Sequence, residues 1–170
     1  MKIIAGILIV FGAYYANAKF LEMQRIEVDI DPKYIKVSSH LQKVDNLNVV
    51  NLDLDVLQDE TDVQYMATVF KENLDHYELV YKSELVSGCT HEEINDPILK
   101  FIFKESEKYG NVTQACPLKV GHYTLRGFKI DSEDLPHQLP SGKYRFDFSA
   151  FIKMNGFLHE IYTDKYYYLS

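Results

Sequence analysis

Apolar and polar side chains alternate along most of this chain with a period of two residues, as they do in half-buried strands. Near the beginning, Ile26, Val28 and Ile30 share one side of an extended segment, while Glu27 and Asp29 take the other. The same alternation marks the stretches 52–56, 77–85 and 144–152, and further strand signals cover 34–37, 63–70, 122–130 and 156–168. We therefore predict an all-β domain, an immunoglobulin-like sandwich or cup of about eight strands in two packed sheets.

One segment between the predicted strands has helical periodicity instead. Asn95-Asp96-Pro97 combines an N-cap with proline at the first helical position, and Gly110 stands where a helix would end. The residues between them separate into an apolar stripe and a charged face. The stripe consists of Ile98, Leu99, Ile102 and Phe103, and the charged face consists of Lys100, Lys104, Glu105, Glu107 and Lys108. We predict one short helix here.

The first eighteen residues have the pattern of a secretory signal peptide. Lys2 provides the positive start, residues 3–16 contain no charge, and Ala16-Asn17-Ala18 places small residues where signal peptidase reads them. The apolar run, about fourteen residues, is shorter than the roughly 17 to 25 that a membrane-spanning helix needs. We therefore expect residues 1–18 to be removed, leaving residues 19–170 as a single secreted, extracellular domain without a membrane span.

The acidic composition argues against two classes of partner. The whole chain carries a net charge of −7. Lys2 is the one basic residue of the predicted signal peptide, so the mature chain would carry about −8. Nucleic acids and anionic membrane surfaces are bound mainly through Lys and Arg. Because the sequence has no basic cluster, we expect neither as a partner.

Cys89 and Cys116 are the only cysteines, and an even number in a secreted chain indicates a disulfide bond. A bridge between them would close a loop of about 27 residues around the predicted helix and contribute roughly 3 to 4 kcal/mol. The alternative, a cysteine nucleophile, needs a reduced thiol and a partnering base, which an oxidising compartment disfavours. Asn111-Val112-Thr113 lies in this loop and is the chain's single sequon, so we expect a glycan on Asn111.

The sequence has no pattern typical of a catalytic or cofactor site. Its six histidines lack metal-ligand spacing, and the His-Glu-Glu run at 91–93 would need further ligands from elsewhere. The Asp-x-Asp pairs at 29–31 and 53–55 are explained by a solvated strand face. There is no nucleophile elbow, phosphate loop or dinucleotide fingerprint. We expect no enzyme activity, metal or cofactor, although paired carboxylates for sugar chemistry would meet only in three dimensions.

Aromatic residues make up 14% of the chain, and tyrosine alone occurs 13 times. Alternating aromatic side chains usually fill a core. A sandwich whose sheets separate, however, lines an apolar pocket with the same residues. Periodicity does not distinguish a filled interior from a hollow one, and both interpretations stay open at this point.

The C-terminal half carries a motif with a recognisable family resemblance. It runs from Cys116-Pro117 through Gly121-His122-Tyr123 and Leu135-Pro136-His137-Gln138-Leu139-Pro140 to Gly142-Lys143-Tyr144-Arg145. Together with Cys89 and the helix start at Asp96-Pro97, it resembles an insect family of small secreted proteins of unknown function. That family is similar to CheB chemosensory proteins and to ML-type lipid-recognition domains, which include the ganglioside activator. The resemblance is specific from Cys89 to Phe148, and the N-terminal half agrees only in its strand pattern.

The resemblance implies a β-sandwich cup that opens between its sheets to take an apolar ligand. The first functional expectation is therefore a carrier or receptor for a lipid, hydrocarbon pheromone or other apolar small molecule, in chemosensation or pheromone response. We expect a dry pocket of roughly several hundred Å³. The residues expected to face the ligand are Tyr77, Leu79, Ile98, Ile102, Phe146 and Phe148. This chain lacks the further cysteine pair common near the N-terminus of relatives, which leaves its N-terminal strands less constrained.

Two other functions compete with the carrier. An extracellular protein-interaction module would have a solid core, no small-molecule ligand and an aromatic surface patch, which we would expect at Tyr166-Tyr167-Tyr168. An extracellular receptor would then be the partner. A hydrolase would instead require two or three convergent titratable groups with perturbed pKa values.

Overall fold

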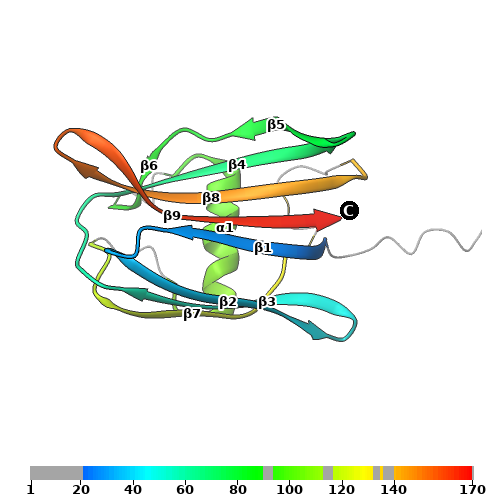
Figure 1. The fold of residues 1–170 in the computed structure, drawn as a ribbon, viewed down its shortest axis with the longest axis horizontal. Coiled ribbons are helices and arrows are strands. Elements are labelled where there is room, and N and C mark those ends of the chain that lie inside the picture. Colours follow the sequence, from blue (N-terminus) through cyan, green and yellow to red (C-terminus); the bar gives the residue numbers. More distant parts are fainter. Residues whose placement is uncertain (1–20, 90–93, 113–116, 132–134, 136–139, 170) are drawn as a thin grey trace, which may run out of the picture.

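Two antiparallel sheets and one helix form the fold in the computed structural model, which describes residues 21–89, 94–112, 117–131, 135 and 140–169. Figure 1 shows the two sheets with helix α1 running across their strands. The predicted all-β, two-sheet architecture is confirmed, with nine strands in the described part of the chain. The predicted signal peptide at 1–18, the run at 91–93 and Cys116 lie outside the described residues.

The larger sheet has the strand order β1-β9-β8-β4-β5, and the short strand β6 also pairs with β4. Its strands are β1 (Glu22–Ile30), β4 (Val63–Asn73), β5 (His76–Lys82), β6 (Val86–Ser87), β8 (Lys143–Met154) and β9 (Phe157–Leu169). The smaller sheet has the order β2-β3-β7. Its strands are β2 (Ile35–Val44), β3 (Leu47–Val56) and β7 (Gly121–Phe128). Because β1 leads directly into β2, the chain changes sheet at residues 31–34 (Figure 1).

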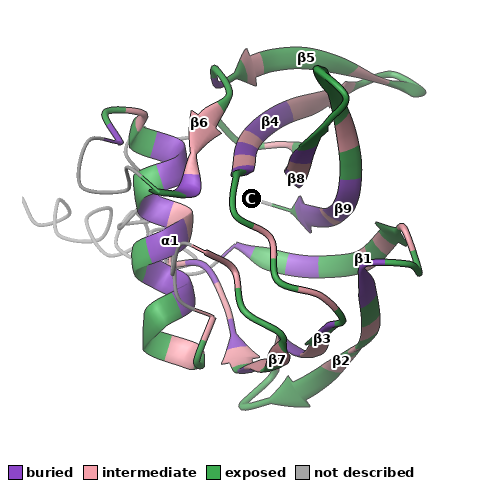
Figure 2. Ribbon diagram, turned by 90° about the vertical axis from the view of Figure 1, so that its left-hand side faces the viewer, coloured by how far each residue is buried: buried purple, intermediate pink, exposed green. Residues whose placement is uncertain are grey.

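The alternating pattern gives both sheets an apolar inner face. On β8, Tyr144, Phe146 and Ile152 are buried, and on β3 the apolar Leu52 and Val56 are buried as predicted. Buried segments of both sheets face a common interior, with α1 beside it (Figure 2). The hydrophobic side chains from the two sheets therefore meet in one layer, as they do in a sandwich.

Helix α1 (Pro97–Tyr109) begins and ends where the sequence predicts. The Asp96 side chain accepts hydrogen bonds from the backbone N–H groups of Ile98 and Leu99, at 3.0 and 2.9 Å. This arrangement satisfies two of the amide groups that a helix leaves unpaired at its start. The Asp96 carboxylate also accepts a hydrogen bond from the Tyr81 hydroxyl on β5. The start of α1 is therefore tied to the larger sheet.

The other end of α1 lies against the smaller sheet. A Cβ atom at Gly110 would lie 1.7 Å from the carbonyl oxygen of Thr124 on β7, so only glycine allows this close approach. The next residue, Asn111, uses its side-chain oxygen to accept a hydrogen bond from the Thr124 N–H at 2.6 Å. Its side-chain nitrogen donates to the His122 carbonyl at 3.1 Å. Helix α1 thus packs against both sheets, with β4 of the larger sheet and β7 of the smaller sheet among its neighbours.

A β-bulge on β5 overturns part of the predicted strand pattern. Val69 pairs with Tyr81, but the next residue of β4, Phe70, pairs with Leu79, so Val80 is an extra residue on β5. An extra residue reverses the side of the sheet to which the following side chains point. Tyr81 packs on the core, while Leu79 is 56% exposed; Leu85, which lies beyond the end of β5, is exposed as well. The expectation that these leucines share the inner face with Tyr81 is wrong.

The solvent face predicted for α1 needs one correction. Glu105 is only 3% exposed, although it was expected on the charged face. Its carboxylate is paired with the ammonium group of Lys108 at 2.5 Å, one helical turn further on. A buried carboxylate needs such a partner, because desolvation otherwise disfavours its charge. Phe101, which the pattern left unassigned, is buried in the core.

Candidate functional site

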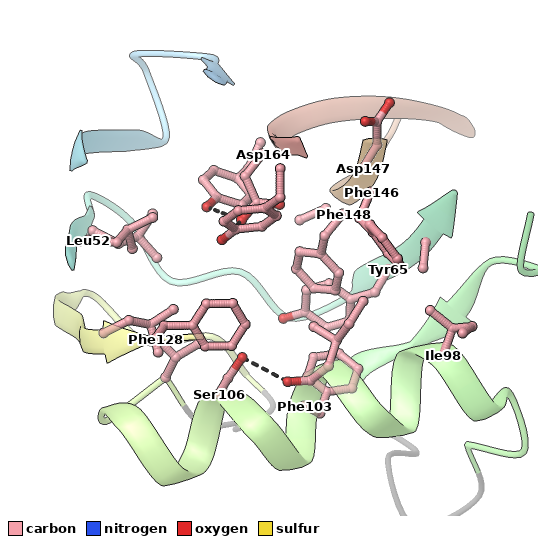
Figure 3. Close-up of a pocket in the computed structure, with 18 of the residues that line it drawn as sticks. Leu52, Tyr65, Ile98, Phe103, Ser106, Phe128, Phe146, Asp147, Phe148 and Asp164 are labelled. Carbon is pink, nitrogen blue, oxygen red and sulfur yellow. Dashed lines mark hydrogen bonds between the residues drawn. The ribbon is translucent and has the colours of Figure 1, made fainter. Parts of the chain in front are cut away.

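A cavity of about 100 Å³ lies between the two sheets and beside α1. Its walls are mostly apolar side chains from β3, β4, β7, β8, β9 and α1 (Figure 3). Aromatic wall residues are Tyr65, Phe101, Phe103, Tyr123, Phe128, Phe146, Phe148, Tyr162 and Tyr166. The cavity is smaller than the several hundred Å³ that the resemblance led us to expect. It is nevertheless the kind of space that apolar ligands enter, since an apolar cavity of about 150 Å³ can hold benzene.

Three aromatic rings form the wall between α1 and the larger sheet. Tyr65 on β4 stacks on Phe148 of β8, with ring centroids 5.5 Å apart. Phe103 of α1 meets both rings edge-on, at 5.1 Å from Tyr65 and 5.6 Å from Phe148. Offset and edge-to-face contacts of this kind stabilise aromatic clusters. The position of α1 therefore determines how closely this wall is packed.

The opposite wall carries a polar group at Asp164 on β9. The Oδ2 atom of Asp164 accepts hydrogen bonds from the hydroxyls of Tyr162 and Tyr166, at 2.9 and 2.5 Å. All three residues line the cavity, and Asp164 is only 4% exposed. Figure 3 shows this group across the cavity from α1. The second carboxyl oxygen, Oδ1, has no hydrogen-bond partner among the described residues.

Burial determines the protonation of this group. It raises the pKa of Asp164 to about 7, although the hydrogen bonds from Tyr166 and Tyr162 act in the opposite direction. Burial also raises the pKa values of both tyrosines well above their usual range, and the neighbouring Asp164 raises them further. The tyrosines therefore stay neutral donors, while Asp164 titrates near neutral pH.

Four of the six residues expected to face a ligand line the cavity. Ile98 and Ile102 contribute from α1, and Phe146 and Phe148 contribute from β8. Whether they bind a ligand stays a prediction. They are brought together because the helical stripe of α1 packs over the inner face of β8 and β4.

Tyr77 and Leu79 do not line the cavity, because the bulge at Val80 turns this part of β5 outward. Tyr77 instead contacts Tyr167, with ring centroids 5.8 Å apart, on the outer face of the larger sheet. The guanidinium carbon of Arg145 lies 5.5 Å from the centre of the Tyr77 ring. Tyr77 thus belongs to a cation–π cluster on the outer surface.

The sequence interpretation missed Asp164, Tyr162 and Tyr166. A signal for them was present, since the three residues alternate at i, i+2 and i+4 in a predicted strand. An acidic residue in register with two aromatic ones is expected to point into the interior with them. A buried carboxylate with tyrosine partners is the consequence.

The expectation of an aromatic surface patch at Tyr166-Tyr167-Tyr168 is wrong. Tyr166, Tyr167 and Tyr168 are 8%, 9% and 1% exposed. The first and third point into the core, and the second packs beneath Arg25, whose guanidinium carbon lies 4.0 Å from the ring centre. The three residues therefore provide no accessible patch for a partner.

The acidic pair on β3 lies on the outer face of the smaller sheet. His122 on β7 reaches Asp55 at 2.7 Å and Asp53 at 3.3 Å, and Arg126 also pairs with Asp53. Hydrogen bonding to Asp55 raises the pKa of His122. Within the described ranges, no group of three His, Cys, Asp or Glu side chains is placed to hold a metal ion.

The predicted disulfide and the predicted glycosylation site each lie only partly within the described residues. Cys89 is exposed near the end of β6, and its sulfur lies 3.3 Å from the Thr61 carbonyl oxygen. Its expected partner, Cys116, and Thr113 of the sequon are outside the described residues. Asn111 is exposed, so a glycan on its side chain would point toward solvent while the amide keeps its contacts with β7. Both modifications stay predictions.

The fold and the cavity define an all-β, two-sheet protein with an apolar interior site. Residues 65–146 match the family model described as "Protein of unknown function (DUF1091)". The matched stretch runs from within β4 to within β8 and includes α1, whereas Asp164 lies beyond it. No curated protein matches the chain. Across the described residues, no helix has the length and apolar character needed to cross a membrane.

Proposed function

We propose that this protein is a secreted, extracellular binding protein for a lipid or another apolar small molecule, held between its two sheets. The observation that carries the proposal is the internal cavity with almost wholly apolar walls. Burying apolar ligand surface there contributes about 25 cal/mol per Å² before the costs of ordering are subtracted. The likeness of the C-terminal motif to CheB and ML-type proteins supports the same function, with chemosensation or pheromone response as its setting.

The size of the cavity implies that the walls move when a ligand longer than a few carbon atoms enters. A cavity of about 100 Å³ holds a small apolar molecule or one end of a longer one. The wall formed by Phe103 belongs to α1, whose polar attachments to the sheets lie at its two ends and whose middle packs through apolar and aromatic side chains. An outward shift of α1 would enlarge the site without breaking either sheet ladder.

The proposed role is binding without catalysis. The Asp164 group has the perturbed pKa values that an acid–base site would need. Thr68, Ser106 and Asp147 also line the cavity. Asp147 directs its carboxylate away from the interior to Arg145, at 2.8 Å (Figure 3). The Ser106 hydroxyl donates to the Ile102 carbonyl at 2.9 Å. Neither is placed to act with Asp164 on a substrate.

Native mass spectrometry of the protein secreted from insect cells tests this function, followed by organic extraction of the bound material. We expect an additional mass that is lost on extraction. Ser106→Leu places a larger apolar side chain in the cavity and should abolish the additional mass. Ser38→Leu is the matched control, because Ser38 is exposed on β2, and it should retain the ligand.

The proposal would be contradicted if both the native chain and the control showed only the mass of the protein without a ligand and took up no added apolar compound. The protein-interaction module would then be favoured. Its surface would have to be sought away from Tyr166-Tyr167-Tyr168, for example at the β8–β9 hairpin, where Phe157 is 78% exposed.

A further inference from the structure

The unpartnered oxygen of Asp164 points to the chemistry of the ligand's polar end. Asp164 is buried in the cavity wall, and its Oδ2 atom already accepts hydrogen bonds from both Tyr162 and Tyr166. Its Oδ1 atom finds no partner among the described residues. Buried carboxyl oxygens without a partner are rare, because desolvation is then uncompensated. This position thus combines an apolar surrounding with an unmet hydrogen bond at Oδ1, and the buried Tyr168 hydroxyl on the same strand is likewise without a partner among the described residues.

The unmet hydrogen bond changes direction with protonation. When Asp164 is ionised, Oδ1 needs a donor. When Asp164 is protonated, Oδ2 is occupied by two phenol donors, so the proton belongs on Oδ1, which then needs an acceptor. A hydroxyl group can be donor or acceptor and satisfies Oδ1 in both states.

We propose that the ligand carries a hydroxyl group, and that Asp164, positioned by Tyr162 and Tyr166, hydrogen-bonds it through Oδ1. This inference rests on the proposed function. It assigns the ligand class as an apolar alcohol, with the hydroxyl at β9 and the hydrocarbon directed toward the aromatic wall at α1 (Figure 3). Oδ1 is buried, so the hydroxyl reaches it as the ligand widens the cavity.

The same geometry disfavours other apolar ligands. A fatty acid would place a second carboxylate beside Asp164, and two carboxylates that share a buried site cannot both ionise without a large cost. A pure hydrocarbon would leave Oδ1 without a partner. An ether supplies an acceptor only, so it fits the protonated state and not the ionised one.

The test compares three probes that share an unbranched chain of eight carbons, at pH 8.5, where Asp164 is mostly ionised: 1-octanol, its methyl ether and octanoate. Binding is followed by NMR through the methyl groups of Ile98 and Ile102, which line the cavity. We expect 1-octanol to bind about tenfold more tightly than the ether, the equivalent of one hydrogen bond. Octanoate should bind more weakly than both. At pH 5.5 the ether should approach the alcohol, because protonated Asp164 can donate to it.

Asp164→Asn provides the matched variant. Its amide oxygen can accept from the two tyrosines, and its NH₂ group then presents only a donor to the ligand. The preference for 1-octanol over the ether should fall to less than about threefold, and octanoate should gain affinity. Asp29→Asn is the control, because Asp29 is exposed on the outer face of the same sheet and pairs with Lys165. It should keep the selectivity of the native chain.

Equal binding of 1-octanol and its ether by the native chain at pH 8.5 would overturn the inference, since a trapped water would then serve Oδ1. Tightest binding of octanoate would overturn it as well. In either case binding itself would still support the proposed function. Failure of all three probes to bind would contradict the proposed function and the inference together. These native-chain results decide the question even if the variant does not fold.

Discussion

The hydroxyl of Tyr144 donates a hydrogen bond to the carbonyl of Pro140, 2.6 Å away, at the point where β8 begins. Both residues belong to the Pro-x-Gly-x-Tyr part of the C-terminal motif. The Tyr144 ring is 2% exposed and packs in the core. The motif thus uses one buried side chain to fasten Pro140 to the start of a central strand.

Replacing Tyr144 with phenylalanine tests this role. The change keeps the ring but removes the hydroxyl, and the Pro140 carbonyl loses this donor. We expect Tyr144→Phe to lower the free energy of unfolding by about 1 to 2 kcal/mol, measured by urea denaturation. Tyr77→Phe, in the outer-surface cluster, should change it by less than about 0.5 kcal/mol. Equal effects of the two substitutions would contradict the assigned role.

Asp164 should make the protein less stable as pH rises through neutrality. Its pKa is about 7 in the folded state against 3.8 as its ordinary value, so the folded state holds the proton more tightly. The free energy of unfolding therefore falls between pH 4 and pH 7, the reverse of an ion-paired carboxylate. Tyr162, Tyr166 and Tyr168 face the group from its own strand, and Asp147 on β8 raises its pKa further.

Asp164→Asn isolates this contribution, because asparagine imitates the protonated acid. The native chain should lose roughly 2 kcal/mol more than the variant between pH 5 and pH 8. Urea denaturation of both proteins at the two pH values gives the difference directly. The stabilising charge of His122 is also lost in this range, but the loss is the same in both proteins and cancels in the difference between them. An unchanged pH profile would show that Asp164 is ionised throughout.

The buried tyrosines should couple alkaline titration to unfolding. Burial raises the pKa values of Tyr162, Tyr166 and Tyr168 well above 10, and it raises that of Tyr65 to about 12. Because the unfolded state releases these protons more easily, stability falls as pH rises above 10. We expect tyrosinate absorbance to increase first for the exposed phenols and then in a cooperative step with loss of circular dichroism. A single gradual titration would contradict the burial.

Two residues that were both expected to face the ligand should differ in how much they contribute to stability, because the bulge at Val80 turns one of them outward. Leu79 is exposed, and Leu79→Ala should change the free energy of unfolding by less than about 0.5 kcal/mol. Ile98 is buried under α1, and Ile98→Ala should cost about 2 to 4 kcal/mol. Thermal or urea denaturation distinguishes the two. A large loss from Leu79→Ala would place that side chain back in the core.

The expected bridge between Cys89 and Cys116 can be tested by counting free thiols. Intact mass before and after reduction, under denaturing conditions with a thiol-alkylating reagent, counts the free thiols. We expect none before reduction and two after it. Cys89→Ser should then lower the free energy of unfolding by roughly 3 kcal/mol, by the entropy of the loop that the bridge closes. Two reactive thiols in the secreted protein would refute the bridge.

Local patterns located α1 and eight of the nine strands in the described residues, although they missed β6 and most of the β2–β3 hairpin beyond the predicted stretches 34–37 and 52–56. The start at Asp96-Pro97 and the end at Gly110 depend on capping geometry that neighbouring residues determine. The bulge at Val80 could not be predicted, because an extra residue has meaning only against the partner strand. Nothing in the run His76 to Lys82 states how it pairs with β4.

The cavity and its polar group lay further beyond the reach of the sequence. The alternation of Tyr162, Asp164 and Tyr166 indicates which side of the strand Asp164 shares, but its pairing with β1 and β8 and its burial follow only from the assembled sheets. The volume of the interior depends on how Phe103, Tyr65 and Phe148 pack against one another. Such contacts join residues far apart in the chain, so the periodicity of apolar positions does not predict them.

The two attachments of α1 have a consequence for selectivity. Asp96 holds one end to β5 through Tyr81, and Gly110 holds the other to β7 through its close approach to Thr124. The helix therefore acts as a spacer of fixed length, and the distance between its anchors limits how far the sheets can separate. A larger side chain at position 110, or the loss of the hydrogen bond at Asp96, would change that distance without altering any residue of the cavity wall. Proteins with the same cavity walls would therefore select ligands of different size when the attachment points of their helix differ.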